Sequence, residues 1–191
     1  MRRRKSLLNK SWEAVGLLVG IVGLLLAVKP RLEASPQYPM LRNSQPFTVP
    51  FRLSNTGFLP MHIDGVACYL SRVEGTSYVL GDLVVYEAGW GDRELPGGES
   101  ETVQCRIGIS EYPQRADIAV VVLYHNWGMP SLEMHYFRFV GSGPGDNWQW
   151  LQQPSAEIEA ASQARISQWK RRVEALQQAR TDGQLYHRAV R

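Results

Sequence analysis

Residues 117–125, DIAVVVLYH, form a nearly continuous apolar run. A strand with one face in water alternates apolar and polar residues, whereas a strand buried on both faces is apolar throughout. The run therefore predicts a central β-strand. Residues 133–140 are expected to pair with it as a hairpin across residues 126–131.

Strand patterns also precede this run. Phe47, Val49, Phe51 and Leu53 alternate with more polar residues, and further strands are expected over 61–71, 78–86 and 101–109. Turn residues such as Asn55-Thr56-Gly57 separate them. Six or seven short strands over residues 47–152 predict a mainly β fold, an antiparallel sandwich of immunoglobulin (Ig) type.

The two cysteines of the chain lie on predicted strands. Cys68 shares a face with Val66 and Leu70, and Cys105 shares one with Val103 and Ile107. Both thiols are therefore expected to point into one core. An even cysteine count in an oxidising compartment predicts a disulfide between Cys68 and Cys105.

Three segments carry a family resemblance. FRLSNTGFLP at 51–60, LPGGES at 95–100 with the TVQC strand after it, and ADIAVVVLY at 116–124 resemble bacterial Ig-like envelope modules. Residues 1–152 also resemble small, uncharacterised bacterial single-pass membrane proteins with an extracytoplasmic Ig-like β-sandwich. The shared motifs are structural, so the resemblance implies a fold and a compartment and assigns no catalytic residue.

Residues 12–28, WEAVGLLVGIVGLLLAV, carry no charge after Glu13. This length of apolar helix predicts a transmembrane helix preceding the sandwich. The basic segment 1–11 also suits a cleaved signal peptide, but the flank after Val28 lacks a small-residue cleavage site, which favours an anchor.

Charge around this segment predicts its orientation. Five basic residues precede it and only Lys29 and Arg31 follow closely. The positive side stays cytoplasmic, so the expected localisation is the inner (cytoplasmic) membrane with the main domain extracytoplasmic. Gly16 and Gly20 form a GxxxG pattern, which suits a homodimer interface between two such helices.

Two segments flank the predicted sandwich. Residues 29–46 contain four prolines and predict an extended stalk. Residues 153–191 predict an amphipathic helical tail, with a C-terminal α-helix over 155–180. Three interpretations of this helix remain open: a solvated tail, a coiled-coil strand, or a helix lying on anionic lipid through its basic residues.

Composition limits the function classes. The net charge is +3, but residues 14–154 carry nine basic and thirteen acidic residues, which argues against nucleic acid as a partner. The common catalytic fingerprints are absent, so no enzyme activity and no cofactor are predicted. The predicted function is a membrane-anchored extracytoplasmic interaction or accessory module with a protein partner in the envelope.

Tryptophans and histidines supply the candidate site residues. Trp90, between glycines, and Trp127, at a predicted turn, are candidate interaction residues, with a core-capping role as the alternative. His125 and His135 would fall nearly opposite each other on the predicted hairpin. They support the alternative function, a loop-based hydrolase or metal-binding protein.

Overall fold

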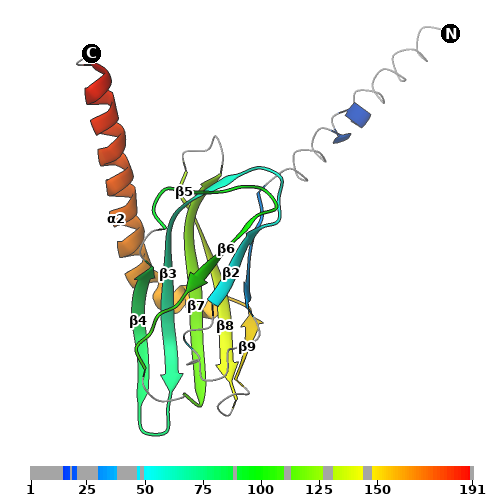
Figure 1. The fold of residues 1–191 in the computed structure, drawn as a ribbon, viewed down its shortest axis with the longest axis vertical. Coiled ribbons are helices and arrows are strands. Elements are labelled where there is room, and N and C mark those ends of the chain that lie inside the picture. The colour runs from blue at the N-terminus through cyan, green and yellow to red at the C-terminus, as the bar shows by residue number, and fades with distance from the viewer. Residues whose placement is uncertain are drawn as a thin grey trace, which may run out of the picture.

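The computed structural model describes residues 15–17, 19–20, 30–37, 47, 50–87, 90–109, 113–126, 131–143 and 148–189. These residues form two antiparallel β-sheets and a long C-terminal helix, α2 (Figure 1). One apolar core lies between the sheets, and a second lies between the larger sheet and α2. The larger sheet is therefore the middle of three layers.

Strand order defines the two sheets. The three-stranded sheet has the order β1-β2-β6, from Leu32–Pro36, Pro50–Asn55 and Ser100–Gln104. The six-stranded sheet has the order β4-β3-β7-β8-β9, and β5 also pairs with β3. Its strands are β3 (Met61–Glu74), β4 (Val79–Glu87), β5 (Arg93–Leu95), β7 (Arg115–Asn126), β8 (Glu133–Ser142) and β9 (Gln149–Gln153).

Strand β7 is the central strand predicted from its apolar run. Val120 and Val122 belong to the core between the sheets, while Ala119 and Val121 belong to the core under α2. Successive side chains of a strand point to opposite faces, so both faces of β7 are covered. The immunoglobulin arrangement of four and three strands differs from the three and six strands described here.

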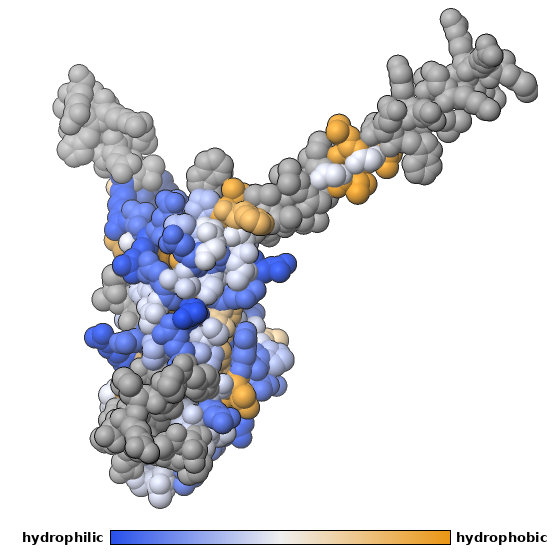
Figure 2. All heavy atoms as spheres, turned by 45° about the vertical axis from the view of Figure 1, so that its right-hand side comes forward, coloured by the Kyte–Doolittle hydropathy of each residue, from blue (hydrophilic) through white to orange (hydrophobic). Residues whose placement is uncertain are grey.

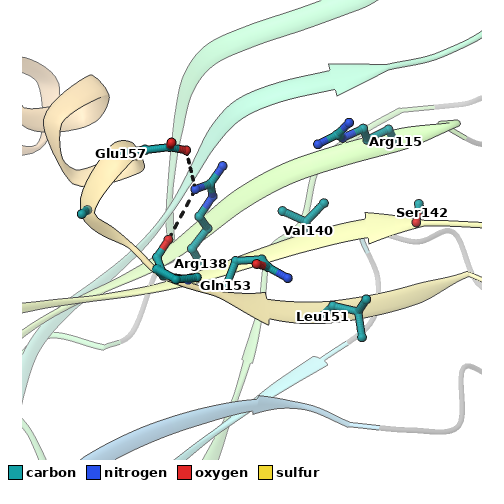
Figure 3. Close-up of a pocket in the computed structure, with 9 residues that line it drawn as sticks. Arg115, Arg138, Val140, Ser142, Leu151, Gln153 and Glu157 are labelled. Carbon is teal, nitrogen blue, oxygen red and sulfur yellow. Dashed lines mark hydrogen bonds and ion pairs between the residues drawn. The ribbon is translucent and has the colours of Figure 1, made fainter.

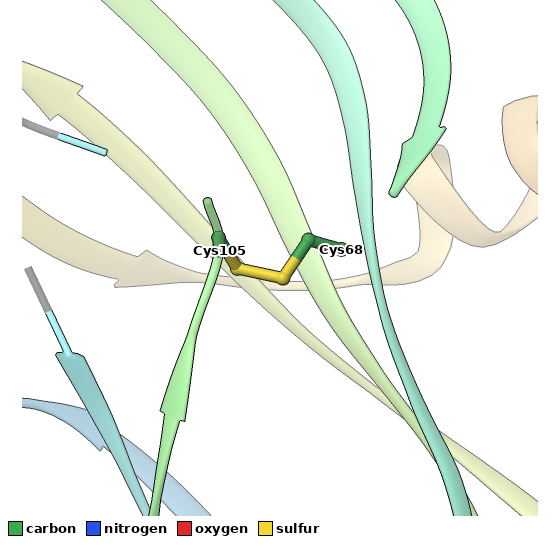
Figure 4. Close-up of a disulfide and its surroundings, with 2 residues drawn as sticks. All are labelled: Cys68 and Cys105. Atoms are coloured by element: carbon green, nitrogen blue, oxygen red, sulfur yellow. A yellow bond between two sulfur atoms is a disulfide. The ribbon is translucent and has the colours of Figure 1, made fainter. Parts of the chain in front are cut away.

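A disulfide between Cys68 and Cys105 crosses the core between the sheets (Figure 4). Both cysteines are fully buried, as their positions on apolar strand faces predict. Trp148 and Trp150 are buried in the same core, where the Trp150 ring packs edge-on against Phe51. The predicted disulfide is confirmed, and these two tryptophans are core residues.

Helix α2 (Ala156–Ala189) begins on the face of the large sheet that points away from the small sheet. Ile158 and Ile166 are buried against this face, Trp169 is half-buried, and Leu176 is 65 % exposed. Arg138 of β8 forms ion pairs with Asp117 of β7 at 2.7 Å and with Glu157 of α2 at 2.8 Å. The first half of the helix is therefore docked, which excludes a wholly solvated tail.

The structure contradicts the prediction of a transmembrane helix over residues 12–28. Within the part of the chain that the structure describes, no helix is both long and apolar enough to cross a membrane. A span needs about 20 consecutive apolar residues, whereas the described helical residues of this segment are 15–17 and 19–20. The rest of it lies outside the described residues. The single-pass inner-membrane localisation, which rested on this helix, is corrected with it, and dimerisation through Gly16 and Gly20 stays a prediction.

Candidate interaction surface

The predicted interaction residue Trp90 is a core residue. Its side chain is 5 % exposed and belongs to the cluster between the sheets. The Arg93 guanidinium lies 5.5 Å from the centre of its ring, a cation–π contact that covers the indole further. Trp90 is therefore unavailable as an exposed anchor, and the core-capping alternative holds. Trp127 lies outside the described residues.

The predicted pair of His125 and His135 does not form. The β7–β8 ladder places His135 opposite Val122, three residues from His125. Because side chains alternate between faces, an odd offset puts the two imidazoles on opposite sides of the sheet. The described residues contain no group of three or more His, Cys, Asp or Glu placed to hold a metal. The pairing of His125 and His135, on which the metal-binding or hydrolase alternative rested, is therefore not present.

His125 instead belongs to a polar cluster beneath α2. Its Nδ1 lies 2.7 Å from Oδ2 of Asp64, a β3 residue whose side chain is 5 % exposed. The His62 ring stacks on the His125 ring with centroids 4.9 Å apart. Gln177 of α2 donates a hydrogen bond to the other oxygen of Asp64. This cluster fastens the second half of α2 to β3.

Asp64 reaches this position because β3 contains a bulge. Ile63 pairs with Tyr124 and Gly65 pairs with Leu123, so Asp64 is an extra residue with no partner on β7. Gly65 then lies under α2: a Cβ atom there would come within 2.8 Å of the Trp169 ring. The bulge and the glycine together let the helix approach the sheet closely at this point.

Strand β4 carries the main exposed apolar surface among the described β-strands. It is an edge strand, because β3 is its only neighbour among the strands that the structure describes. Four large apolar side chains on it are exposed: Val79 (65 %), Leu80 (43 %), Leu83 (46 %) and Tyr86 (50 %). The face of the molecule in Figure 2 is mostly hydrophilic over the body of the protein. A long apolar edge with unpaired backbone groups is a template for another strand.

The exposed side chains of β4 lie on both faces of the edge. Leu80 and Leu83 pair with Val73 and Leu70, which face the small sheet. Tyr86 pairs with Ala67 on the other face, where its ring lies 5.6 Å from the Trp169 ring of α2. An added strand, whose side chains also alternate, would contact apolar groups on both faces at once.

Asp82 interrupts this edge near its middle. Its φ of 53° lies in the left-handed region, which non-glycine residues seldom adopt. The neighbouring Gly81 leaves no room for a side chain, since a Cβ atom would lie 2.6 Å from the Ser71 carbonyl oxygen. Arg165 of α2 donates two hydrogen bonds to the Asp82 carboxylate, and Tyr69 donates a third. Arg165 of α2 thus stabilises the left-handed residue of the edge strand.

Electrostatics at Asp82 follow from these contacts. The hydrogen bond from Arg165 holds the pKa of Asp82 below its ordinary value and raises the pKa of Arg165. Burial, together with the Asp82 charge, raises the pKa of Tyr69. The ionised carboxylate is the form that the surrounding side chains stabilise.

Comparisons with known proteins supply no relative. No family model, no curated protein and no solved structure matches this chain. The resemblance to envelope modules therefore rests on the sequence motifs alone.

The sequence predicted a strand over 78–86 but not its position at the edge of the sheet. One signal was present, because VLGDLVVY has apolar residues on both faces of a strand and a glycine with an aspartate between them. Apolar residues on both faces also fit a central strand. Only the strand order distinguishes the two positions.

Proposed function

We propose that this protein is an interaction module that binds an extended segment of a partner protein as an additional strand along β4. The observation that carries the proposal is the exposed apolar edge formed by Val79, Leu80, Leu83 and Tyr86. Strand addition supplies main-chain hydrogen bonds for affinity and alternating side-chain contacts for specificity.

The energetics favour an apolar partner segment. Complete burial of an exposed valine or leucine side chain contributes about 1.5–3 kcal/mol, and the β4 side chains are about half exposed. Covering four of them would provide several kcal/mol, before the cost of ordering the partner segment is subtracted. A partner segment with apolar residues at alternate positions on each face fits this edge.

The left-handed backbone and the charge of Asp82 argue for a different chain as the occupant, in place of a second copy of this protein. Bulges and charges on edge strands are features by which proteins prevent identical edges from pairing. In β4 the irregular residue, Asp82, is also charged, and Arg165 holds it in place. The regular stretch from Leu83 to Glu87, which pairs continuously with β3, is the part of the edge that an added strand would follow.

Peptide selection on the immobilised full chain tests the proposal. Nine-residue peptides from a random display library should yield apolar, β-branched sequences whose binding slows amide hydrogen exchange along β4. Methylation of alternate backbone nitrogens of a selected peptide should abolish binding, because it removes the ladder hydrogen bonds while keeping the side chains.

A pair of lysine substitutions supplies the matched control. Leu83→Lys should weaken binding of the selected peptides at least tenfold, whereas Phe58→Lys, at an exposed phenylalanine between β2 and β3, should leave their binding unchanged. Equal binding to all three proteins would overturn the assignment to β4. Concentration-dependent dimers that Leu83→Lys abolishes would show that a second copy is the occupant instead.

A further inference from the structure

A groove of about 670 Å³ lies on the face of the large sheet that carries α2, beside the beginning of that helix. It is distant in the strand order from β4, since it lies over β7, β8 and β9. The residues that line it are Arg115, Arg138, Val140, Ser142, Leu151, Gln153, Pro154, Ala156 and Glu157 (Figure 3).

The floor of this groove is partly apolar. Val140 of β8 and Leu151 of β9 are directly paired across the ladder, and the Leu151 side chain is 57 % exposed. Figure 3 shows Arg115 from β7, Val140 from β8 and Leu151 from β9 in succession across the groove. A cationic side chain therefore lies beside two adjacent aliphatic ones.

The arginines around the groove differ in their partners. Arg138 is fully engaged, because it forms ion pairs with Asp117 and Glu157 and also donates to the Pro154 carbonyl oxygen. Arg72, in a smaller adjoining cavity of about 150 Å³, pairs with Glu74.

Arg115 lines both the groove and the smaller cavity. Within the described part of the chain, no hydrogen bond or ion pair occupies its guanidinium group. Arg115 is also exposed, so a ligand can reach the guanidinium from solvent.

We propose that this groove binds a small apolar carboxylate, either the last residue of a peptide or a free acid of similar size. The Arg115 guanidinium would donate two parallel hydrogen bonds to the carboxylate, the geometry for which arginine is best suited. The aliphatic part of the ligand would lie on Val140 and Leu151. Of the acidic groups that line the groove and the adjoining cavity beside Arg115, Asp117 and Glu157 both pair with Arg138, and Glu74 pairs with Arg72. The Arg115 guanidinium therefore remains open to a ligand.

Calorimetric titration of the full chain tests this assignment with three probes: acetyl-Ala-Val-Leu with a free carboxylate, the same peptide as its C-terminal amide, and octanoate. The free acid should bind at least tenfold more tightly than the amide, since a charge-assisted bidentate contact is lost in the amide. Binding of octanoate as well assigns the site to apolar carboxylates generally, and binding of the peptide acid alone assigns it to chain termini. The proposal is overturned when neither the peptide acid nor octanoate binds, or when the peptide acid and its amide bind equally.

Three variants separate the contributions. Arg115→Gln should remove the tenfold preference for the acid. Leu151→Ser should weaken the binding of the peptide acid and of the peptide amide by the same factor. Arg52→Gln, at an exposed arginine of β2 in the small sheet, removes one positive charge away from the groove and should leave the preference intact. Loss of the preference in Arg52→Gln would show a general charge effect and overturn the role of Arg115. Leu83→Lys should not alter these titrations, so this proposal and the β4 proposal fail independently.

Discussion

The guanidinium group of Arg165 on α2 binds both carboxylate oxygens of Asp82 on β4, with Nε 2.8 Å from Oδ1 and Nη2 2.5 Å from Oδ2. These residues are 83 positions apart in the chain. The contact joins the helix to the one residue of β4 that leaves the extended conformation. The position of the helix and the shape of the exposed edge are therefore coupled.

We expect Asp82→Asn to lower the melting temperature in a pH-dependent way. Asparagine tolerates the left-handed conformation, so the substitution removes mainly the charge. The lowered pKa of Asp82 means that its contribution is present above the ordinary carboxyl value of 3.8 and is lost as the pH falls through the lowered pKa. Thermal unfolding at pH 7 should separate the two proteins, and at pH 2.5 the difference should shrink. A difference that stays constant with pH would contradict the ionic role.

Docking of α2 predicts unequal effects of two alanine substitutions in the same helix. Ile166 is fully buried and Leu176 is 65 % exposed. Ile166→Ala should lower the free energy of unfolding by about 2–5 kcal/mol, and Leu176→Ala should change it by less than about 0.5 kcal/mol. Urea unfolding followed by tryptophan fluorescence measures both. Similar values for the two variants would show that the helix is not docked in solution.

Burial of Trp90 predicts a loss of stability when it is truncated. Trp90→Ala should cost about 3–5 kcal/mol, the usual range for removing a buried aromatic side chain. Trp90→Phe keeps part of the packing and should cost less. Guanidinium unfolding of the two variants checks this order. A Trp90→Ala protein as stable as the wild type would show that the indole is exposed.

The Cys68–Cys105 disulfide closes a loop between residues 37 positions apart. In the chain-entropy model, this loop length stabilises the folded state by about 3–4 kcal/mol. Urea midpoints of the oxidised protein and of the Cys68→Ala/Cys105→Ala double variant should differ accordingly. Mass spectrometry of the oxidised protein should find no reactive thiol, and detection of two thiols would refute the bridge.

Several features of the fold could be predicted from local patterns. The unbroken apolar run of β7 predicted a strand covered on both faces, because no other strand position removes all its side chains from water. The buried faces of Cys68 and Cys105 followed from the two-residue period of their strands. These predictions held because they depend on neighbouring residues alone.

The site was harder to predict because it depends on strand order and register. Whether β4 is an edge or an interior strand cannot be decided from its own residues. The pairing of His125 and His135 failed because the hairpin register differs by an odd number of residues from the register assumed. Trp90 appeared exposed because glycines flank it, although the core of the sandwich extends to its position.

The bulge in β3 determines which single-residue deletions this strand can accept. Removing Asp64 would leave Met61 and Ile63 on the core face and His62 and Gly65 on the helix face, since Asp64 has no partner on β7. Removing a paired residue such as Ala67 instead would move every side chain on one side of the deletion to the opposite face of the sheet. The ladder does not require Asp64; what the extra residue adds is a carboxylate for His125 and Gln177. Deletion of Asp64 would thus preserve the sandwich and release the distal part of α2.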